Sequence, residues 1–356
     1  MNYAQKLYYA VSSWLRPDNF TLKEAIEQSV DEGLFSFPDL KYQIRALKQT
    51  LTLPAIERWL ALTSVQPGTL EGKKILSLNA GNLPLVGVHD LIGITLTGAD
   101  YNGKLSRKDP YLLPSFLSIL QQEFPKIQFI WSESLSDFGG MKADALIYTG
   151  SEENRNEVNN LLKSMNIISD ATPTLTRTTH FSVAWIQNRN QLTMEELTNA
   201  MLRYNGHGCR SVAMVVAPFG LKEIECHLAD VIELFWMENP PHKPPVKALL
   251  YRYAYNRASG TNQIWMNNFL IEERMEKPEH PSVVQWFQGD ESDLRTFLKK
   301  HRGGIQTVYT EDDKAGDELE GFITEPLSSS QVPPLWWKPD GVDTLEWLIS
   351  NLEDIG

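Results

Sequence analysis

The stretch Lys73-Lys74-Ile75-Leu76-Ser77-Leu78-Asn79 has the pattern of a short buried strand, and Ala80-Gly81-Asn82-Leu83-Pro84 follows it as a turn. A buried helix is predicted over Val86–Leu96, and a second apolar strand over Ala99–Leu105. Strand, turn, helix and strand in this order are the repeating unit of a parallel sheet covered by helices. This stretch therefore places the chain in the α/β class.

The same alternation extends along the chain. Helices are predicted over residues 3–64, 110–124 and 152–165, and strands over residues 127–131 and 143–149. A second series of strands is predicted over residues 181–186, 211–217, 263–271, 282–287 and 305–309. Because 356 residues exceed one ordinary hydrophobic core, two domains are expected.

Composition narrows the range of partners. The net charge of −12 argues against nucleic acid or an anionic membrane as the main partner. The only cysteines, Cys209 and Cys226, cannot build a disulfide framework or a zinc cluster, so we expect a reducing cytoplasm and no metal site. The first 20 residues lack the features of a signal peptide, and no apolar run approaches the roughly 18 residues of a membrane span.

One turn carries a candidate nucleophile. The segment Asn205-Gly206-His207-Gly208-Cys209-Arg210 lies between a predicted helix and a predicted strand. Its glycines allow a substrate to approach the backbone closely, and His207 and Arg210 favour the thiolate of Cys209. His207 is also a candidate local base. A buried structural cysteine beside a tight turn, with an ordinary turn histidine, is the alternative that this motif leaves open.

Polar residues follow the strands of the first series. Ligands of parallel sheets bind at the carboxyl ends of strands, where Asn82 and Lys104 lie. The Asn82 amide could donate to an oxyanion, although asparagine is also common in turns. Lys104, with Ser106 and the basic residues Arg107 and Lys108, suits the ribose or phosphate of a cofactor, or forms a solvated basic cluster.

The turn Thr149-Gly150-Ser151 comes just before a predicted helix, which is a position that often faces a phosphate. Glu152 and Glu153 in the first turn of that helix suit its dipole but repel a phosphate. The chain contains no Gly-x-Gly-x-x-Gly, so a dinucleotide would have to bind by another arrangement.

Three of these segments together resemble a family. The run from Leu78 to Asp90, which contains Gly81-Asn82-Leu83-Pro84, is similar to the Gly-Asn-x-Pro segment of acyl-CoA reductases. These are the relatives of the bioluminescence fatty-acid reductase, within the aldehyde dehydrogenase superfamily. Gly206-His207-Gly208-Cys209-Arg210 resembles their nucleophile segment, and the run from Asp340 to Leu345 resembles their C-terminal motif. The resemblance covers roughly residues 70–350.

The resemblance implies an aldehyde dehydrogenase-like fold of two α/β domains with a cleft between them. Residues 1–175 would form a helical region and a dinucleotide-binding domain, residues 176–325 the catalytic domain, and residues 326–356 a C-terminal tail and helix. The superfamily binds its dinucleotide without the glycine fingerprint and forms dimers, so a homodimer is expected.

The resemblance also implies roles for individual residues. Cys209 corresponds to the nucleophile, and Asn82 to the asparagine that holds the oxyanion. Lys104 falls on the lysine that binds the cofactor, and Thr149, Gly150 and Ser151 fall on the turn beside it.

Two departures from the superfamily pattern bear on the reaction. Hydrolytic aldehyde dehydrogenases carry a glutamate base before the cysteine, but residues 177–182 contain no carboxylate. No counterpart of a second glutamate aligns near residues 277–281. Because hydrolysis of an acyl-enzyme needs a positioned base, the sequence favours exchange with a thiol or reduction.

The predicted function is therefore reduction of an acyl-CoA, or another acyl thioester, to an aldehyde through an acyl group on Cys209. A nicotinamide cofactor would supply the hydride, and the basic residues Lys104, Arg107 and Lys108 favour NADPH over NADH. Two alternatives stay open. One is a non-catalytic binding or scaffold protein that retains the fold. The other is a cysteine acyltransferase or thioesterase that uses no dinucleotide.

Overall fold

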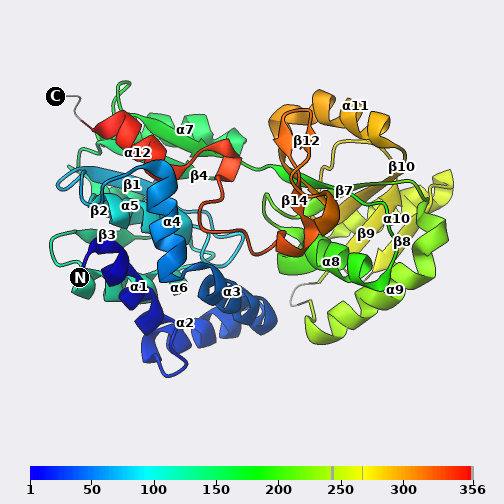
Figure 1. Ribbon diagram of the computed structural model, residues 1–356, viewed down its shortest axis with the longest axis horizontal. Helices are drawn as coiled ribbons and strands as arrows, with labels where there is room; N and C mark the ends of the chain where they lie inside the picture. Colours follow the sequence, from blue (N-terminus) through cyan, green and yellow to red (C-terminus); the bar gives the residue numbers. More distant parts are fainter. Residues whose placement is uncertain (242–243, 267, 354–356) are drawn as a thin grey trace. The chain divides into compact units, whose positions relative to one another are not determined.

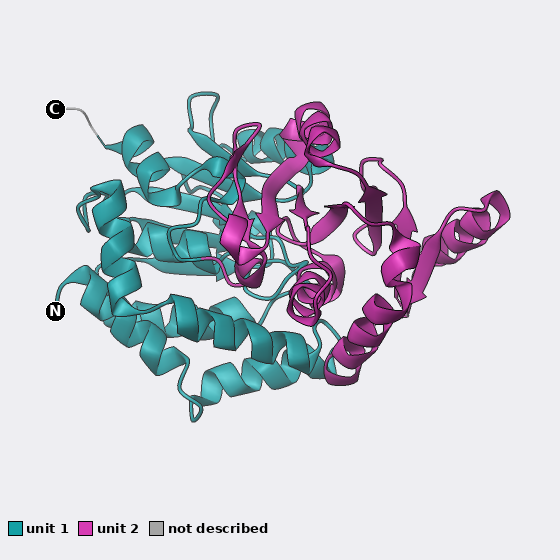
Figure 2. Cartoon of the chain, turned by 45° about the vertical axis from the view of Figure 1, so that its right-hand side comes forward, with its two compact units in different colours: residues 1–179, 334–356 teal, residues 180–333 magenta. Residues whose placement is uncertain are grey.

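The computed structural model describes residues 1–241, 244–266 and 268–353. The chain divides into two compact units, which Figure 2 shows in teal and magenta. Unit 1 consists of residues 1–179 and 334–356, and unit 2 of residues 180–333. The C-terminal segment from residue 334 thus belongs to the same unit as the N-terminus, whereas a separate tail was expected over residues 326–356.

Unit 1 is built around a parallel sheet with the order β3-β2-β1-β4-β5 in the described residues (Figure 1). The order reverses between β1 and β4, which creates the switch point where such sheets bind ligands. The strands are β1 (Lys74–Leu78), β2 (Asp100–Lys104), β3 (Phe129–Ser132), β4 (Ala145–Thr149) and β5 (Thr174–Arg177). The helices are α1 (Tyr3–Trp14), α2 (Phe20–Asp31), α3 (Phe37–Thr50), α4 (Leu53–Thr63), α5 (Val88–Thr97), α6 (Leu112–Glu123), α7 (Glu152–Ser164) and α12 (Thr344–Leu352).

Strands β1 and β4 of unit 1 send alternate side chains to two separate cores, as the pleat of a strand requires. Ile75 packs into the larger core with α1, α4, α5 and α6, and its neighbour Leu76 packs into a smaller core on the other face. Two buried tryptophans of the larger core form side-chain hydrogen bonds to residues far away in the sequence. The indole N–H of Trp14 donates to Ser115 of α6 at 2.8 Å, and that of Trp59 donates to Asp343 at 2.8 Å.

Strand β5 was not predicted from the sequence, which assigns residues 171–179 to a crossing between domains. The strand is polar, and its exposure alternates so that Leu175 and Arg177 are buried. It forms the edge of the sheet and pairs with β4 on one side. A short polar edge strand buries too little apolar surface to show a strand pattern.

Unit 2 contains a second sheet with the order β14-β11-β6-β7-β10-β9-β8, in which β8 and β9 pair antiparallel and the other described neighbours pair parallel. Its strands are β6 (Phe181–Trp185), β7 (Val212–Ala217), β8 (Gln263–Met266), β9 (Phe269–Glu273), β10 (Val283–Gln288), β11 (Ile305–Thr310) and β14 (Glu325–Pro326). Its helices are α8 (Gln191–Leu202), α9 (Leu221–Glu238), α10 (Lys247–Ser259) and α11 (Glu291–His301). The strands β12 (Glu318–Leu319) and β13 (Phe322–Ile323) form a small hairpin. The single strand predicted over residues 263–271 is therefore a hairpin of two strands; residue 267 lies outside the described residues.

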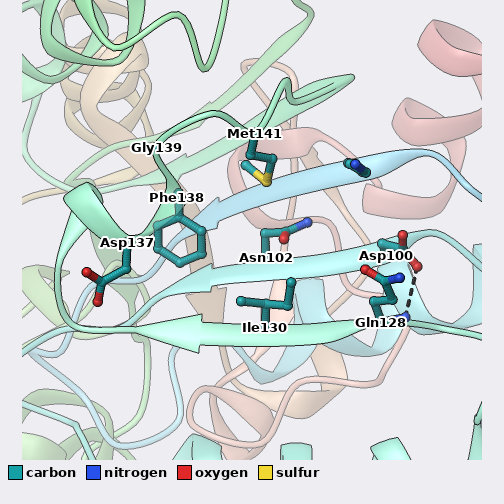
Figure 3. Close-up of a pocket in the computed structure, with 9 residues that line it drawn as sticks. Asp100, Asn102, Gln128, Ile130, Asp137, Phe138, Gly139 and Met141 are labelled. Atoms are coloured by element: carbon teal, nitrogen blue, oxygen red, sulfur yellow. Dashed lines mark hydrogen bonds between the residues drawn. The ribbon is translucent and has the colours of Figure 1, made fainter.

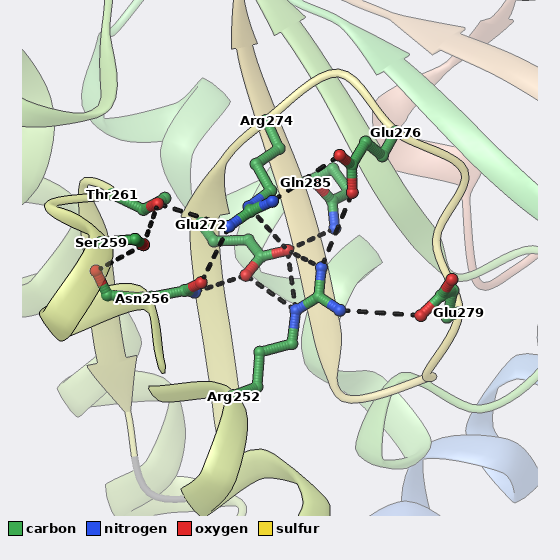
Figure 4. A network of polar contacts seen from close by, with 9 residues as sticks. All are labelled: Arg252, Asn256, Ser259, Thr261, Glu272, Arg274, Glu276, Glu279 and Gln285. Carbon is green, nitrogen blue, oxygen red and sulfur yellow. Dashed lines mark hydrogen bonds and ion pairs between the residues drawn. The ribbon is translucent and has the colours of Figure 1, made fainter. Parts of the chain in front are cut away.

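Helix α10 has no signature in the sequence because its outer face is apolar and its inner face is polar. Tyr251 and Tyr255 are 74% and 64% exposed. On the inner face, Arg252 and Asn256 donate to the carboxylate of Glu272 on β9, which is fully buried (Figure 4). Burial raises the pKa of Glu272, but the hydrogen bonds from Arg252, Asn256 and Gln285 together lower it below its usual value. An ion pair and amide hydrogen bonds thus attach α10 to the sheet.

Candidate functional site

The turn after β1 holds Asn82 at the carboxyl edge of the sheet of unit 1. The side chain of Asn82 is exposed, and the surrounding turn is tightly packed. A Cβ on Gly87 would lie 2.1 Å from Oδ1 of Asn79, whose amide donates to the hydroxyl of Tyr101 at 2.8 Å. The glycine at position 87 is therefore required for the close approach of the turn to the end of β1.

Lys104 is the last residue of β2 and is half-buried. Burial lowers the pKa of its ammonium group, the nearby Arg107 lowers it further, and Glu133 opposes both. Beyond it, the N–H of Lys108 donates to the hydroxyl of Ser106 at 3.2 Å. Arg107 and Lys108 are exposed, so an anion that binds here would meet two exposed cations and one partly desolvated lysine.

Thr149 ends β4, and Gly150 and Ser151 lead into α7. The N–H of Gly150 donates to the carbonyl of Arg177 at 3.0 Å, and the hydroxyl of Tyr148 donates to the carbonyl of Ser151 at 2.8 Å. Ser151 occupies the N-cap position, yet its hydroxyl makes no capping bond within the described chain. That hydroxyl is therefore available to a ligand at the start of α7.

The strand register brings these segments to one edge of the sheet. Leu78 at the end of β1 is level with Lys104 on one side and with Tyr148 on the other. The Asn82 turn, the Lys104–Lys108 segment and the Thr149–Ser151 turn therefore all follow the same row of strand ends. They also lie on either side of the switch point between β1 and β4, where a nucleotide would be expected.

A separate pocket lies on a face of this sheet, and none of the predicted site residues line it. Figure 3 shows the residues that line it, which come from β1, β2, the edge strand β3 with the residue before it, and the segment before β4. They are Lys74, Asp100, Asn102, Gln128, Ile130, Asp137, Phe138, Gly139 and Met141.

In unit 2, Cys209 lies on a turn with unusual backbone angles. Tyr204, Asn205, Gly206 and Gly208 have φ values of 55°, 56°, 68° and 102°. Left-handed conformations at non-glycine residues cost free energy, and they concentrate at functional sites. A Cβ on Gly206 would lie 2.3 Å from the carbonyl oxygen of Pro281, so only glycine fits there.

The backbone around Cys209 is fixed by serine hydroxyls. Ser182 donates to the carbonyl of Cys209 at 2.8 Å, and Ser211 donates to the carbonyl of His207 at 2.7 Å. The guanidinium of Arg210 donates to the carbonyl of Gln331 at 3.3 Å. His207, Cys209 and Arg210 are all half-buried, and Cys209 lies on this hydrogen-bonded turn with a basic residue two positions before it and another directly after it.

Tyr309 is a neighbour of this turn that the sequence analysis did not identify. It is fully buried on β11, and its hydroxyl donates to the carbonyl of Ser330 at 3.2 Å. Burial raises the pKa of Tyr309 well above its usual value; Glu325 and Cys209 add to this shift, and Arg210 opposes it. Tyr309 is separated from Cys209 by 100 residues, and in the sequence it reads as an ordinary core residue of a strand.

The two segments that correspond to glutamate-bearing segments of the superfamily make ion pairs within their own units. Arg177 is buried and forms an ion pair with Asp90 of α5, with nitrogen–oxygen distances of 3.1 and 3.3 Å. It also donates to the hydroxyl of Thr344 at 2.8 Å, so this side chain is fully engaged within unit 1. In the second segment, Glu279 is 3.6 Å from Arg252, and its side chain is 81% exposed.

Within the described residues, no cluster of three or more His, Cys, Asp and Glu side chains is arranged to hold a metal ion. The same residues contain no helix with the length and apolar character needed to cross a bilayer.

No protein-family model matches the chain, and no curated protein matches it. Solved structures do. Aldehyde dehydrogenase 21 from Physcomitrella patens, in complex with succinate, matches with a TM-score of 0.63 at 11% identity, over 98% of this chain and 84% of that one. A putative methylmalonate-semialdehyde dehydrogenase from Sinorhizobium meliloti, complexed with NAD, gives 0.60 at 13% identity, over 88% and 74% of the two chains.

A third match is glyceraldehyde-3-phosphate dehydrogenase from Methanocaldococcus jannaschii, complexed with NADP, with a TM-score of 0.56 at 11% identity, over 87% of this chain and 77% of that one. These structures confirm the aldehyde dehydrogenase-like α/β fold that the sequence predicts. At such low identity they show the fold alone, and they do not single out acyl-CoA reductases within the superfamily.

Proposed function

We propose that this protein is a nicotinamide-dependent oxidoreductase that reduces an acyl-CoA, or another acyl thioester, to an aldehyde. Aldehyde dehydrogenase-fold proteins in complex with NAD and NADP support the coarser part of the proposal, a nicotinamide cofactor and aldehyde chemistry. The direction of the reaction rests on one observation in this chain. The segment where a hydrolytic relative carries its base instead holds Arg177, whose guanidinium is paired with Asp90.

The thiolate of Cys209 is proposed to attack the thioester carbonyl. A new carbon–sulfur bond forms, the CoA thiolate leaves and takes up a proton, and the acyl group stays on Cys209. The resemblance assigns the oxyanion to the Asn82 amide, and the N–H of Cys209 is proposed to assist it. This pairing, the cleft between the two domains and a role of His207 as local base all stay predictions.

The residues at the strand ends of unit 1 fit a dinucleotide in their chemistry. Lys104 offers a partly desolvated cation, and Ser106 and Ser151 offer hydroxyls. When bound, a nicotinamide would supply the hydride that reduces the acyl group, and the carbon–sulfur bond to Cys209 would break to release the aldehyde and return the thiolate. The exposed cations Arg107 and Lys108 suit a 2′-phosphate, so NADPH is proposed over NADH. Glu152 and Glu153 would keep the phosphates away from the first turn of α7.

The test follows absorbance at 340 nm with a series of acyl-CoAs and both cofactors, and measures the intact mass of the protein after incubation with acyl-CoA alone. The proposal predicts cofactor oxidation that requires acyl-CoA, and one acyl group that is lost in Cys209→Ala. Cys226→Ala is the matched control, because Cys226 is exposed on α9 and should keep both signals. Oxidation of aldehydes to acids without CoA would refute the proposal.

Two other outcomes would identify the alternatives. Dinucleotide binding without acylation of Cys209 would indicate a binding or scaffold protein. Acylation without dinucleotide binding would indicate an acyltransferase or thioesterase. A homodimer in the cytoplasm belongs to the same proposal, and sedimentation that shows only monomer would contradict the dimer.

A further inference from the structure

Two turns of unit 1 meet in direct contact at the carboxyl edge of the sheet. A Cβ on Gly81 would lie 2.5 Å from the hydroxyl oxygen and 2.7 Å from the Cβ of Ser106. The turn that carries Asn82 and the turn that carries Lys104 and Ser106 are therefore packed backbone to side chain. A shift of one turn must move the other.

Asp109 joins these two turns by hydrogen bonds. Its own N–H donates to the carbonyl of Ser106 at 3.0 Å, which closes the second turn. Its Oδ2 accepts the N–H of Leu85 from the first turn at 2.8 Å. Leu85 has a φ of 63°, a left-handed conformation that leucine rarely adopts, so something must hold it there.

The buried position of Asp109 makes the charged form of its carboxylate unfavourable in free energy. The residue is 6% exposed, and its Oδ1 is buried without a hydrogen-bond partner among the described residues. Burial raises the pKa of Asp109 to about 6, although the N–H groups of Leu85 and Leu112 oppose the shift. A buried, half-satisfied carboxylate is uncommon, and a structural reason for it is expected.

We propose that Asp109 is a positioning residue that tethers the Asn82 turn to the Lys104–Ser106 turn, and so presents one fixed edge to the cofactor. The tether itself is a property of the fold. Only the identity of the ligand rests on the function proposed above.

The tether is tested with Asp109→Ala, which removes the acceptor, and Asp109→Asn, which keeps an acceptor oxygen in the same place. Asp100→Ala is the matched control, because Asp100 is also buried and accepts a backbone N–H, from Gln128 at 2.8 Å, at the opposite end of β2. Two quantities are measured for each protein. They are the amide hydrogen exchange of residues 79–88 and the dissociation constant for NADPH.

Asp109→Ala should speed exchange in residues 79–88 and weaken NADPH binding, each by about tenfold, as expected for a lost hydrogen bond to a charged group. In Asp109→Asn, the exchange rate of residues 79–88 and the dissociation constant for NADPH should both lie within about threefold of the wild-type values. Asp100→Ala should change neither quantity by more than about threefold. Unchanged exchange in Asp109→Ala, or an equal rise throughout unit 1, would overturn the tether. If the wild-type protein binds neither NADPH nor NADH, the proposed function fails, and the exchange measurement still decides whether the tether exists.

Discussion

Replacement of Arg177 by methionine should destabilise unit 1 strongly. The side chains of Arg177 and Asp90 are each 7% exposed, so neither charge is solvated by water in the folded protein. Burial disfavours the charged form of Asp90, but Arg177, His89 and Thr344 together lower its pKa well below the usual range. The carboxylate therefore stays ionised and loses its main partner in the variant. Removal of one member of a buried ion pair costs about 3–5 kcal/mol.

The double variant Asp90→Leu/Arg177→Met separates the ion pair from simple packing. It removes both charges and fills the space with apolar atoms, so it should recover most of the loss and lie within about 1–2 kcal/mol of wild type. Because a chain of two units need not unfold in one step, the free energy is measured locally, by hydrogen exchange in α12, to which Arg177 bonds through Thr344. A single variant that loses less than about 1 kcal/mol, or a double variant as unstable as the single one, would refute the reasoning.

Three further outcomes are expected. Gly206→Ala should reduce acylation of Cys209 and should destabilise unit 2 more than Gly260→Ala does. Both glycines have positive φ, but a new Cβ meets Pro281 only at position 206. Equal losses of melting temperature in the two variants would contradict this. Wild-type stability should fall relative to Asp109→Asn by on the order of 2 kcal/mol between pH 4 and pH 6, because the folded protein holds a proton on Asp109 up to about pH 6 and the unfolded chain releases it near 3.8; parallel denaturation curves across this range would refute it. Glu272→Gln should destabilise α10 by about 2 kcal/mol, as charged hydrogen bonds to Arg252 are lost, and unchanged exchange in residues 247–259 would exclude this role.

The α/β class and most elements of the fold follow from local patterns in the sequence. Buried parallel strands such as β1 and β7 appear as short apolar runs, and the helices between them show apolar faces. The aldehyde dehydrogenase-like fold predicted from the resemblance is confirmed. The candidate site residues of unit 1 also follow from local order, because Lys104 and Thr149 are the last residues of their strands and Asn82 lies in the turn after β1.

Two of the elements that were missed, β5 and α10, have a local sequence that does not match their position in the fold. Strand β5 is polar because it is an edge strand, and α10 turns Arg252 and Asn256 inward because the buried Glu272 binds them. The sequence of the strand or of the helix alone does not reveal which residues it contacts, because the contacts that stabilise each element are made with residues far away in the chain.

The sequence by itself determined approximately where the strands of unit 1 end and which turn carries Cys209, whereas the half-buried state of Cys209 and the exposure of Cys226 came from the structure. Such features depend on short-range periodicity and on glycine conformation, which are local properties. Only the tertiary structure decided that Arg177 is neutralised by Asp90, that Tyr309 lies near Cys209, and that Asp109 holds Leu85. The two residues of each pair lie 24 to 100 positions apart in the chain. Local sequence cannot reveal such pairs, because burial and charge pairing depend on which chain segments pack together.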